Sequence, residues 1–181
     1  MAKKMRPPRT NLWWVPISVA DTEAEVLSAA LYAPGGGAID ISCAVVSGYT
    51  LAATDSATDS TTSICDTTAA NTPTQDNFEA DLTFFREHID EGTGKADATS
   101  RYEIAFQLFK VGGARGNITG WLVERVGYPQ TAAAAKGQPV SGYRVMPDNP
   151  RTVIGEGTAT IQFGVKFLPQ GKMFTNQNLT A

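Results

Sequence analysis

Residues 158–167 read TATIQFGVKF and carry the clearest secondary-structure signal in the chain. Apolar side chains recur there at every second position, at Ala159, Ile161, Phe163, Val165 and Phe167. A period of two is typical of a strand that buries one face and exposes the other. The stretch therefore predicts a half-buried β-strand near the end of the chain.

The same alternation occurs in residues 78–84, which read FEADLTF. The apolar positions are Phe78, Ala80, Leu82 and Phe84, and between them stand Glu79, Asp81 and Thr83. We expect one face of this strand to meet the core and the other to present carboxylates.

Four more strands are predicted, within residues 11–19, 38–53, 117–126 and 141–145. In the first, one face holds Trp13, Val15, Ile17 and Val19, and Pro16 indicates an edge position or a bulge. In the second, one face holds Ile39, Ile41, Cys43 and Val45, which predicts a well-buried strand.

Two helices have start signals. Thr22 and Glu25 have the spacing of a capping box, and Pro34 with three glycines ends the segment, which predicts a short helix or helical turn. Ser100 and Glu103 form a second such pair before residues 101–111, where one helical face holds Tyr102, Ala105, Leu108 and Phe109. The fold class is thus mainly β with one well-defined flanking α-helix.

Length and composition indicate one domain. The chain has 181 residues, of which 42% are hydrophobic and 18% charged, the composition of a globular domain. No apolar run is long enough to cross a bilayer, and the N-terminus lacks the apolar region of a signal peptide, so we expect no membrane insertion. Cys43 and Cys65 have no zinc-site spacing, and we expect them to be reduced and partly buried.

The predicted domain spans residues 11–174, between a basic N-terminal arm at residues 1–10 and a C-terminal tail at residues 175–181. Residues 50–75 are rich in threonine and are expected to form a long loop or a β-hairpin. The net charge is −3, but the first nine residues carry four cations and no carboxylate, so the remainder is acidic. An acidic body argues against a domain that reads nucleic acid, whose affinity comes from Lys and Arg.

A search for chemistry finds no catalytic, cofactor or metal site, so we expect a protein that is not an enzyme. His88 is the only histidine, and no nucleophile motif surrounds a serine or cysteine. Residues 111–117, VGGARGN, lack the GK[ST] ending of a phosphate loop. Asp55, Asp59 and Asp66 lack the glycine and glutamate of a calcium loop, and a solvated acidic loop is the simpler interpretation.

Three stretches resemble the major tail protein, or tail tube protein, of siphophages, particularly those infecting actinobacteria. They are SICDTTAANTPTQDNFEADLTFFREH (63–88), the unit YEIAFQLFKVGG (102–113) with GWLVERVGYP (120–129), and TATIQFGVKFLPQGK (158–172). The resemblance implies a β-sandwich or small barrel whose sheets join those of neighbouring subunits in hexameric rings. These rings stack into a hollow tube through which double-stranded DNA passes.

The resemblance also implies partners and a location. The partners would be further copies of the chain, a tape measure protein, and terminator or tip proteins. The location would be the virion tail, with the host cytoplasm during assembly. The family's long loop and arms bridge rings, so the candidates for inter-ring contacts are Lys3, Lys4, Arg6, Arg9, Asp55 and Asp59.

A wall that DNA passes should not bind phosphates, so we expect the lumen to be neutral or mildly acidic. The candidates for lumen-facing residues are Glu79, Asp81, Glu156 and Gln162, although these carboxylates and Gln162 could equally face outside solvent. Trp13, Trp14 and Trp121 are candidates for aromatic anchors at the subunit interface, and core packing is the alternative for Trp13 and Trp121.

Two other functions are compatible with these patterns. One is another phage assembly protein, such as a capsid decoration or tail terminator subunit. The other is a β-sandwich module that binds carbohydrate or peptide on a platform of Trp13, Trp14 and Tyr128.

Overall fold

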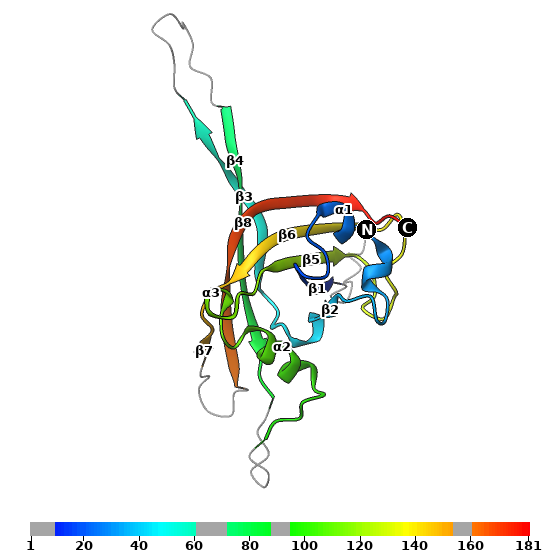
Figure 1. Ribbon diagram of the computed structural model, residues 1–181, viewed down its shortest axis with the longest axis vertical. Coiled ribbons are helices and arrows are strands. Elements are labelled where there is room, and N and C mark those ends of the chain that lie inside the picture. The colour runs from blue at the N-terminus through cyan, green and yellow to red at the C-terminus, as the bar shows by residue number, and fades with distance from the viewer. Residues whose placement is uncertain (1–9, 61–71, 88–94, 154–160) are drawn as a thin grey trace, which may run out of the picture.

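The computed structural model describes residues 10–60, 72–87, 95–153 and 161–181. Within these ranges, eight strands form one sheet in which every pairing is antiparallel, in the order β2-β1-β5-β6-β8-β4-β3, with β7 also on β8 (Figure 1). The strands are β1 Thr10–Pro16, β2 Ile39–Asp40, β3 Thr50–Asp59, β4 Thr72–Phe85, β5 Gly120–Val126, β6 Pro139–Pro147, β7 Arg151–Val153 and β8 Gln162–Asn178. The expected mainly β fold is confirmed.

The segment after β2 bends the sheet towards a barrel. The backbone N–H of Ile41 donates to the carbonyl of Leu12 on β1 at 3.0 Å, and the N–H of Val46 donates to the carbonyl of Thr83 on β4 at 2.7 Å. One short segment thus bonds to β1 and to β4, which are the second strands from the two ends of the sheet order. This closure encloses the apolar faces of the strands and reduces the length of exposed sheet edge.

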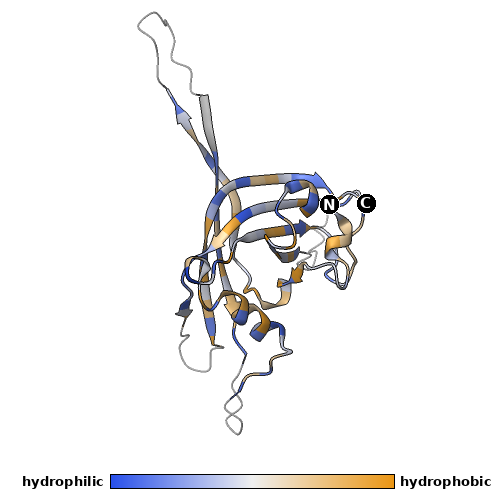
Figure 2. Ribbon diagram, viewed as in Figure 1, coloured by the Kyte–Doolittle hydropathy of each residue, from blue (hydrophilic) through white to orange (hydrophobic). Residues whose placement is uncertain are grey.

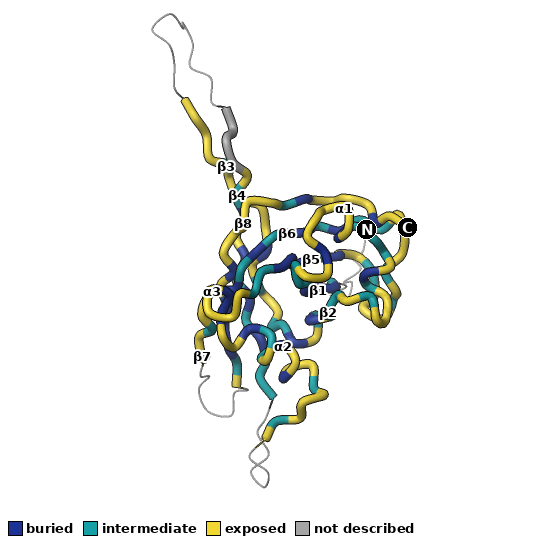
Figure 3. The backbone as a smooth tube through the Cα atoms, viewed as in Figure 1, coloured by how far each residue is buried: buried dark blue, intermediate teal, exposed yellow. Residues whose placement is uncertain are grey.

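The interior of this barrel is an aromatic core. The helix α2, Arg101–Phe109, inserts Ala105 and Phe109 among the inward side chains of the strands. The ring of Phe109 lies 5.2 Å from Trp14, 5.4 Å from Phe84 and 5.3 Å from Phe167, between centroids. Figure 3 shows the buried backbone concentrated where the strands and α2 face each other.

A second apolar cluster covers the outer face of β1 and β5. It contains Trp13, Val15, Trp121 and Val123, and it is covered by the short helix α1, Glu23–Val26, the 3-10 helix η1, Ala29–Tyr32, and the end of β8. Residues 11–15 are therefore buried on both faces, which explains why this strand is apolar at consecutive positions.

Arg125 lies beside Trp13 of this second cluster, and its side chain is fully buried. Its guanidinium donates two hydrogen bonds to Oδ1 of Asn11, at 3.2 and 2.8 Å, and further bonds to Gln138 Oε1 and the carbonyls of Ala132 and Ala133. Burial lowers the pKa of Arg125, and these oxygens satisfy the donors that burial removes from water. The network fixes residues 127–138 to the sheet.

The alternation predicted for residues 78–84 is confirmed, because Phe78, Ala80, Leu82 and Phe84 are all buried. Phe163, Val165 and Phe167 are also buried as predicted, but Ile161 precedes β8 and is 47% exposed, so its inward placement was wrong. Ala159 lies outside the described residues. β8 continues to Asn178, so residues 175–178 belong to the sheet.

The buried strand predicted within residues 38–53 is wrong. β2 has two residues and is followed by the 3-10 helix η2, Ser42–Ala44, in which Cys43 is exposed. The cause is local, because Oδ1 of Asp40 accepts hydrogen bonds from the Ser42 N–H at 2.9 Å and from its hydroxyl at 2.6 Å. Such an Asp-initiated turn competes with strand pairing.

Both predicted helices are present, with corrections at the second. Thr22 and Glu25 form the complete capping box of α1. At α2, Ser100 caps the N–H of Tyr102, but Glu103 is buried and its carboxylate pairs with Gln107, so the second capping box is not reciprocal. Tyr102 was predicted to share the core face of α2 and is instead 38% exposed.

β3 and β4 pair as the two antiparallel strands of a hairpin within the segment expected to be a loop or hairpin, and residues 61–71 lie outside the described residues. Figure 1 shows this hairpin extending along the long axis, well beyond the body of the molecule. Figure 2 shows the far described end of β3 as hydrophilic, in keeping with its exposed side chains. An irregular register between Thr54 and Thr58 marks the point where the hairpin leaves the core.

Candidate functional site

A polar surface lies on the outer side of β3, β4, β7 and β8, and we call it the polar sheet face. Because Phe78, Ala80 and Leu82 point into the core, the alternate residues of β4 point outward. Together with residues of the neighbouring strands, they line an open groove of about 660 Å³. The loop before β3, Val46–Tyr49, forms one wall of this groove. The strand residues that line it include Thr50, Glu79, Asp81, Thr83, Arg151, Val153 and Gln162.

The charges on this face are balanced. Nη2 of Arg151 lies 3.6 Å from Oδ2 of Asp81, and the Cα register places Lys166 of β8 directly opposite Asp81. Glu79 is exposed one step further along the outer side of β4. Two carboxylates and two cations therefore share this region, and Asp81 is a neighbour of both cations.

The wall formed by Val46–Tyr49 is fixed to the barrel by a tyrosine. The hydroxyl of Tyr49 donates a hydrogen bond to Oε1 of Glu124 on β5. The pKa of Tyr49 is raised well above its usual value, mainly by burial and also by the hydrogen bond to the Glu124 carboxylate. The phenol therefore remains protonated, and a hydrogen-bond donor, at neutral pH.

Three of the four residues predicted to face a lumen share this surface. Glu79, Asp81 and Gln162 line the same groove, and Glu156 lies outside the described residues. Their common position results from the antiparallel pairing of β4 with β8, which sets Phe85 opposite Gln162 and Asp81 opposite Lys166.

Sequence reasoning missed Arg151, which balances Asp81. The signal for it was weak, because β7 has only three residues, Arg151–Val153, between a proline and a glycine-rich stretch. The β-branched pair Thr152 and Val153 could have indicated a short strand there.

The residues predicted to contact neighbouring rings are distributed unevenly. Asp55 and Asp59 are exposed on β3, in the part of the hairpin that projects from the body. The basic residues Lys3, Lys4, Arg6 and Arg9 lie outside the described residues.

The tryptophans belong to the core. Trp13, Trp14 and Trp121 expose 6%, 1% and 1% of their surface in the single chain. Trp14 faces the barrel interior, whereas Trp13 and Trp121 face the second cluster. We therefore assign them to packing in place of the predicted interface contacts, and Trp13 and Trp14 cannot form one binding platform with Tyr128.

The remaining reactive groups form no recognisable centre. Within the described ranges, no group of three His, Cys, Asp or Glu side chains could hold a metal ion. Cys43 is exposed, contrary to expectation, and its sulfur lies 3.3 Å from Nη1 of Arg101. Cys65 and His88 lie outside the described residues. Helices in the described part of the chain are too short and polar to cross a membrane.

The chain was compared with family models, with solved structures and with curated proteins. A family model described as "Phage tail tube protein" matches residues 1–181. A solved structure titled "Cryo-EM structure of the anti-feeding prophage (AFP) baseplate, 6-fold symmetrised" aligns with a TM-score of 0.45 and 11% identity, over 98% of this chain and 99% of that chain. A search of curated proteins found no match.

Proposed function

Since the chain belongs to the phage tail tube protein family, we propose that its copies close into hexameric rings that stack into the tube through which DNA leaves the virion. The protein is a structural component of a phage tail, and its place is the virion tail. The observation that carries the ring and channel proposal is the polar sheet face, which is charge-balanced and backed by the aromatic core.

Ring closure is supported by the free edges of the sheet. Among the described strands, β3 ends the sheet order, and β7 pairs only with β8. An unpaired edge exposes backbone N–H and C=O groups that a neighbouring subunit can bond, which also removes an aggregation hazard. We propose that neighbouring copies join their sheets at these edges so that the polar sheet faces form one continuous inner wall.

The chemistry of that wall suits a DNA channel. A wall with free Lys and Arg would bind phosphates and hold the DNA in place. Here Arg151 is close to Asp81, Lys166 is opposite Asp81, and Glu79 adds a further carboxylate. We propose that Glu79, Asp81 and Gln162 face the lumen, and we extend this proposal to Glu156.

Contacts between rings belong to the projecting hairpin, with Asp55 and Asp59, and to the arm with Lys3, Lys4, Arg6 and Arg9. The arm at residues 1–10 and the domain from residue 11 remain part of the proposal. The proposal also includes assembly in the host cytoplasm, an actinobacterial host, and partnership with a tape measure protein and with terminator or tip proteins. It further includes the lack of any enzymatic activity or cofactor.

The test of the proposed function is negative-stain electron microscopy of the purified full chain at rising concentration. Hollow tubes or six-fold rings are the expected result. Particles that remain monomeric at every concentration, including in the presence of isolated tail-tip complexes that could initiate growth, would contradict the proposal and favour a decoration role.

A further inference from the structure

The projecting hairpin belongs to a segment with charges of only one sign. Residues 46–85 contain six carboxylates and no lysine or arginine, the carboxylates being Asp55, Asp59, Asp66, Asp76, Glu79 and Asp81. Asp55 and Asp76 are exposed on the two strands of the hairpin. The described part of the projecting hairpin therefore presents exposed carboxylates, without a lysine or arginine among them, to a neighbouring subunit.

The opposite end of the molecule presents an arginine on an aromatic platform, which we call the Arg86 patch. The guanidinium of Arg86 lies 4.1 Å from the ring centroid of Phe106, and Phe85 contacts Tyr102 with ring centroids 5.9 Å apart. The N–H of Arg86 donates to the carbonyl of Ile161 at 2.9 Å. Tyr102 and Ile161 expose 38% and 47% of their surface, so the patch combines one cation with exposed apolar groups.

Arg86 forms no ion pair with a carboxylate of residues 10–60, 72–87, 95–153 or 161–181. The adjacent Glu87 accepts a hydrogen bond from the Ser100 hydroxyl at the start of α2. Arginine stacked on an aromatic ring keeps its donors at the edge of the guanidinium plane, where an incoming carboxylate can accept them.

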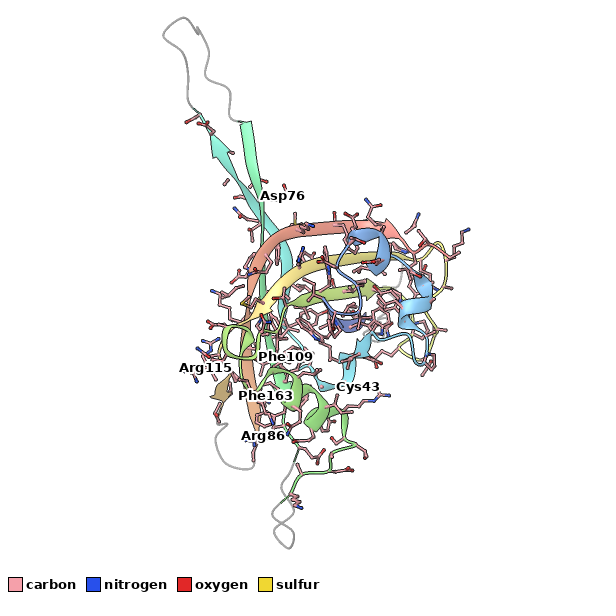
Figure 4. All side chains as sticks on the ribbon, in the orientation of Figure 1. Cys43, Asp76, Arg86, Phe109, Arg115 and Phe163 are labelled. Atoms are coloured by element: carbon pink, nitrogen blue, oxygen red, sulfur yellow. The ribbon has the colours of Figure 1, made fainter. Side chains whose placement is uncertain are left out.

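The two charged features lie at opposite ends of the long axis. Figure 4 shows Asp76 on the hairpin beyond one end of the body and Arg86 near the other end. A contact between two different surfaces of identical subunits does not close on itself when the copies are related by translation, and it generates an open linear assembly. The arrangement of charges therefore suits end-to-end stacking of copies along this axis.

We propose that the Arg86 patch receives the acidic β3–β4 hairpin of a second copy in the adjacent ring, with Arg86 contacting Asp55 or Asp76. This inference rests on the proposed tube and names both surfaces of its axial contact. From Thr54 to Asp59 the hairpin extends by about 17 Å at strand spacing, and Figure 1 shows this part projecting beyond the body. The exposed Tyr102 and Ile161 would be covered by the hairpin.

A charge swap tests this contact. We expect Arg86→Glu to lose long tubes at concentrations where the wild type forms them, or to raise the concentration required by about tenfold or more. Asp55→Arg with Asp76→Arg should have the same effect, because each ring contact repeats in every subunit. Combining all three substitutions in one chain restores opposite charges across the contact, and tube formation should return.

The control variant carries its substitution on a surface away from the Arg86 patch. Arg115→Glu reverses an exposed arginine on the short helix α3, Gly113–Gly116, away from the patch, and should leave tube length unchanged. Because Arg86 packs on Phe106, thermal unfolding of each variant is measured alongside, and the hairpin variant tests the contact without touching that packing. Wild-type tube length in both the Arg86 and the hairpin variants, or no rescue by the swap, overturns this inference and leaves the proposed function standing. A wild type that forms no tubes overturns both.

Discussion

The guanidinium of Arg151 on β7 lies 3.6 Å from the carboxylate of Asp81 on β4, across the outer side of the first part of β8. Both side chains are well exposed, so the pair adds little to folding stability. Its effect is to bring together opposite charges on a surface that would otherwise present Arg151 and Lys166 to passing phosphates.

Reversing the two carboxylates of this face should impair DNA passage. We expect Glu79→Lys with Asp81→Lys to fold and assemble, because both side chains point outward, but to bind DNA inside the tube. The measurement is phage infectivity together with the rate of DNA ejection in vitro, and this rate should rise as added salt weakens phosphate contacts. Glu23→Lys, on α1 over the second cluster, is the matched control. Normal ejection by the double variant would refute the lumen placement.

The Arg125 network should be required for stability. Arg125→Met removes the donors that satisfy Asn11, Gln138 and the carbonyls of Ala132 and Ala133, and we expect a loss of about 2–4 kcal/mol in the free energy of unfolding. Arg125→Lys should recover little of this, because a lysine cannot reproduce the guanidinium fork. Denaturant unfolding provides the measurement. Arg115→Met, on the surface, should stay within about 0.5 kcal/mol of the wild type.

Strands with one polar face could be predicted from the sequence. In β4 and the first part of β8, apolar and polar side chains alternate because one side of the strand meets the aromatic core and the other meets solvent. The residues on their outward side were therefore also assigned correctly. β1 lies between two apolar clusters, and the period of two disappears there. Consequently the tryptophans could not be assigned to core or interface from sequence.

Local turns and distant partners explain the remaining errors. The bonds from Ser42 to Asp40 break the strand expected after Ile39, although the apolar alternation continues. From the sequence alone, Arg125 resembles an ordinary surface arginine. Its partner Asn11 is far away along the chain, and its partner Gln138 lies in the loop before β6. Arg151 reaches the polar sheet face only because β7 pairs with β8.

The end of the chain should contribute to folding. Leu179 is 2% exposed, and its backbone bonds to Gly137 and Gln138. We expect Leu179→Ala to lower the free energy of unfolding by about 2–4 kcal/mol through lost burial and a residual cavity. Asn178→Ala, at the exposed neighbouring position, is the control. Equal unfolding midpoints for the two variants would show that Leu179 packs loosely.

The capping box of α1 should make a small part of the stability depend on pH. Hydrogen bonds from the backbone of Thr22 and Asp21 lower the pKa of Glu25 below its usual 4.5. A lowered pKa in the folded state stabilises it above the ordinary value, and this gain is lost as pH falls through the lowered pKa. Glu25→Gln should therefore differ from the wild type more at pH 7 than near pH 3. A difference that is constant with pH would contradict this assignment.

Phe109 should contribute more to the barrel core than any exposed residue of α2. It is fully buried and contacts aromatic rings from β1, β4 and β8, so its removal affects three strands at once. We expect Phe109→Ala to cost about 3–5 kcal/mol, since a ring-sized cavity cannot collapse among neighbours held by sheet hydrogen bonds. Ile104→Ala, on the same helix but 39% exposed, should cost less than about 1 kcal/mol. Because the polar sheet face is the reverse side of β4 and β8, we also expect Phe109→Ala to reduce tube formation. Unchanged assembly in a destabilised Phe109→Ala protein would mean that neighbouring subunits hold the sheet in shape without this core contact.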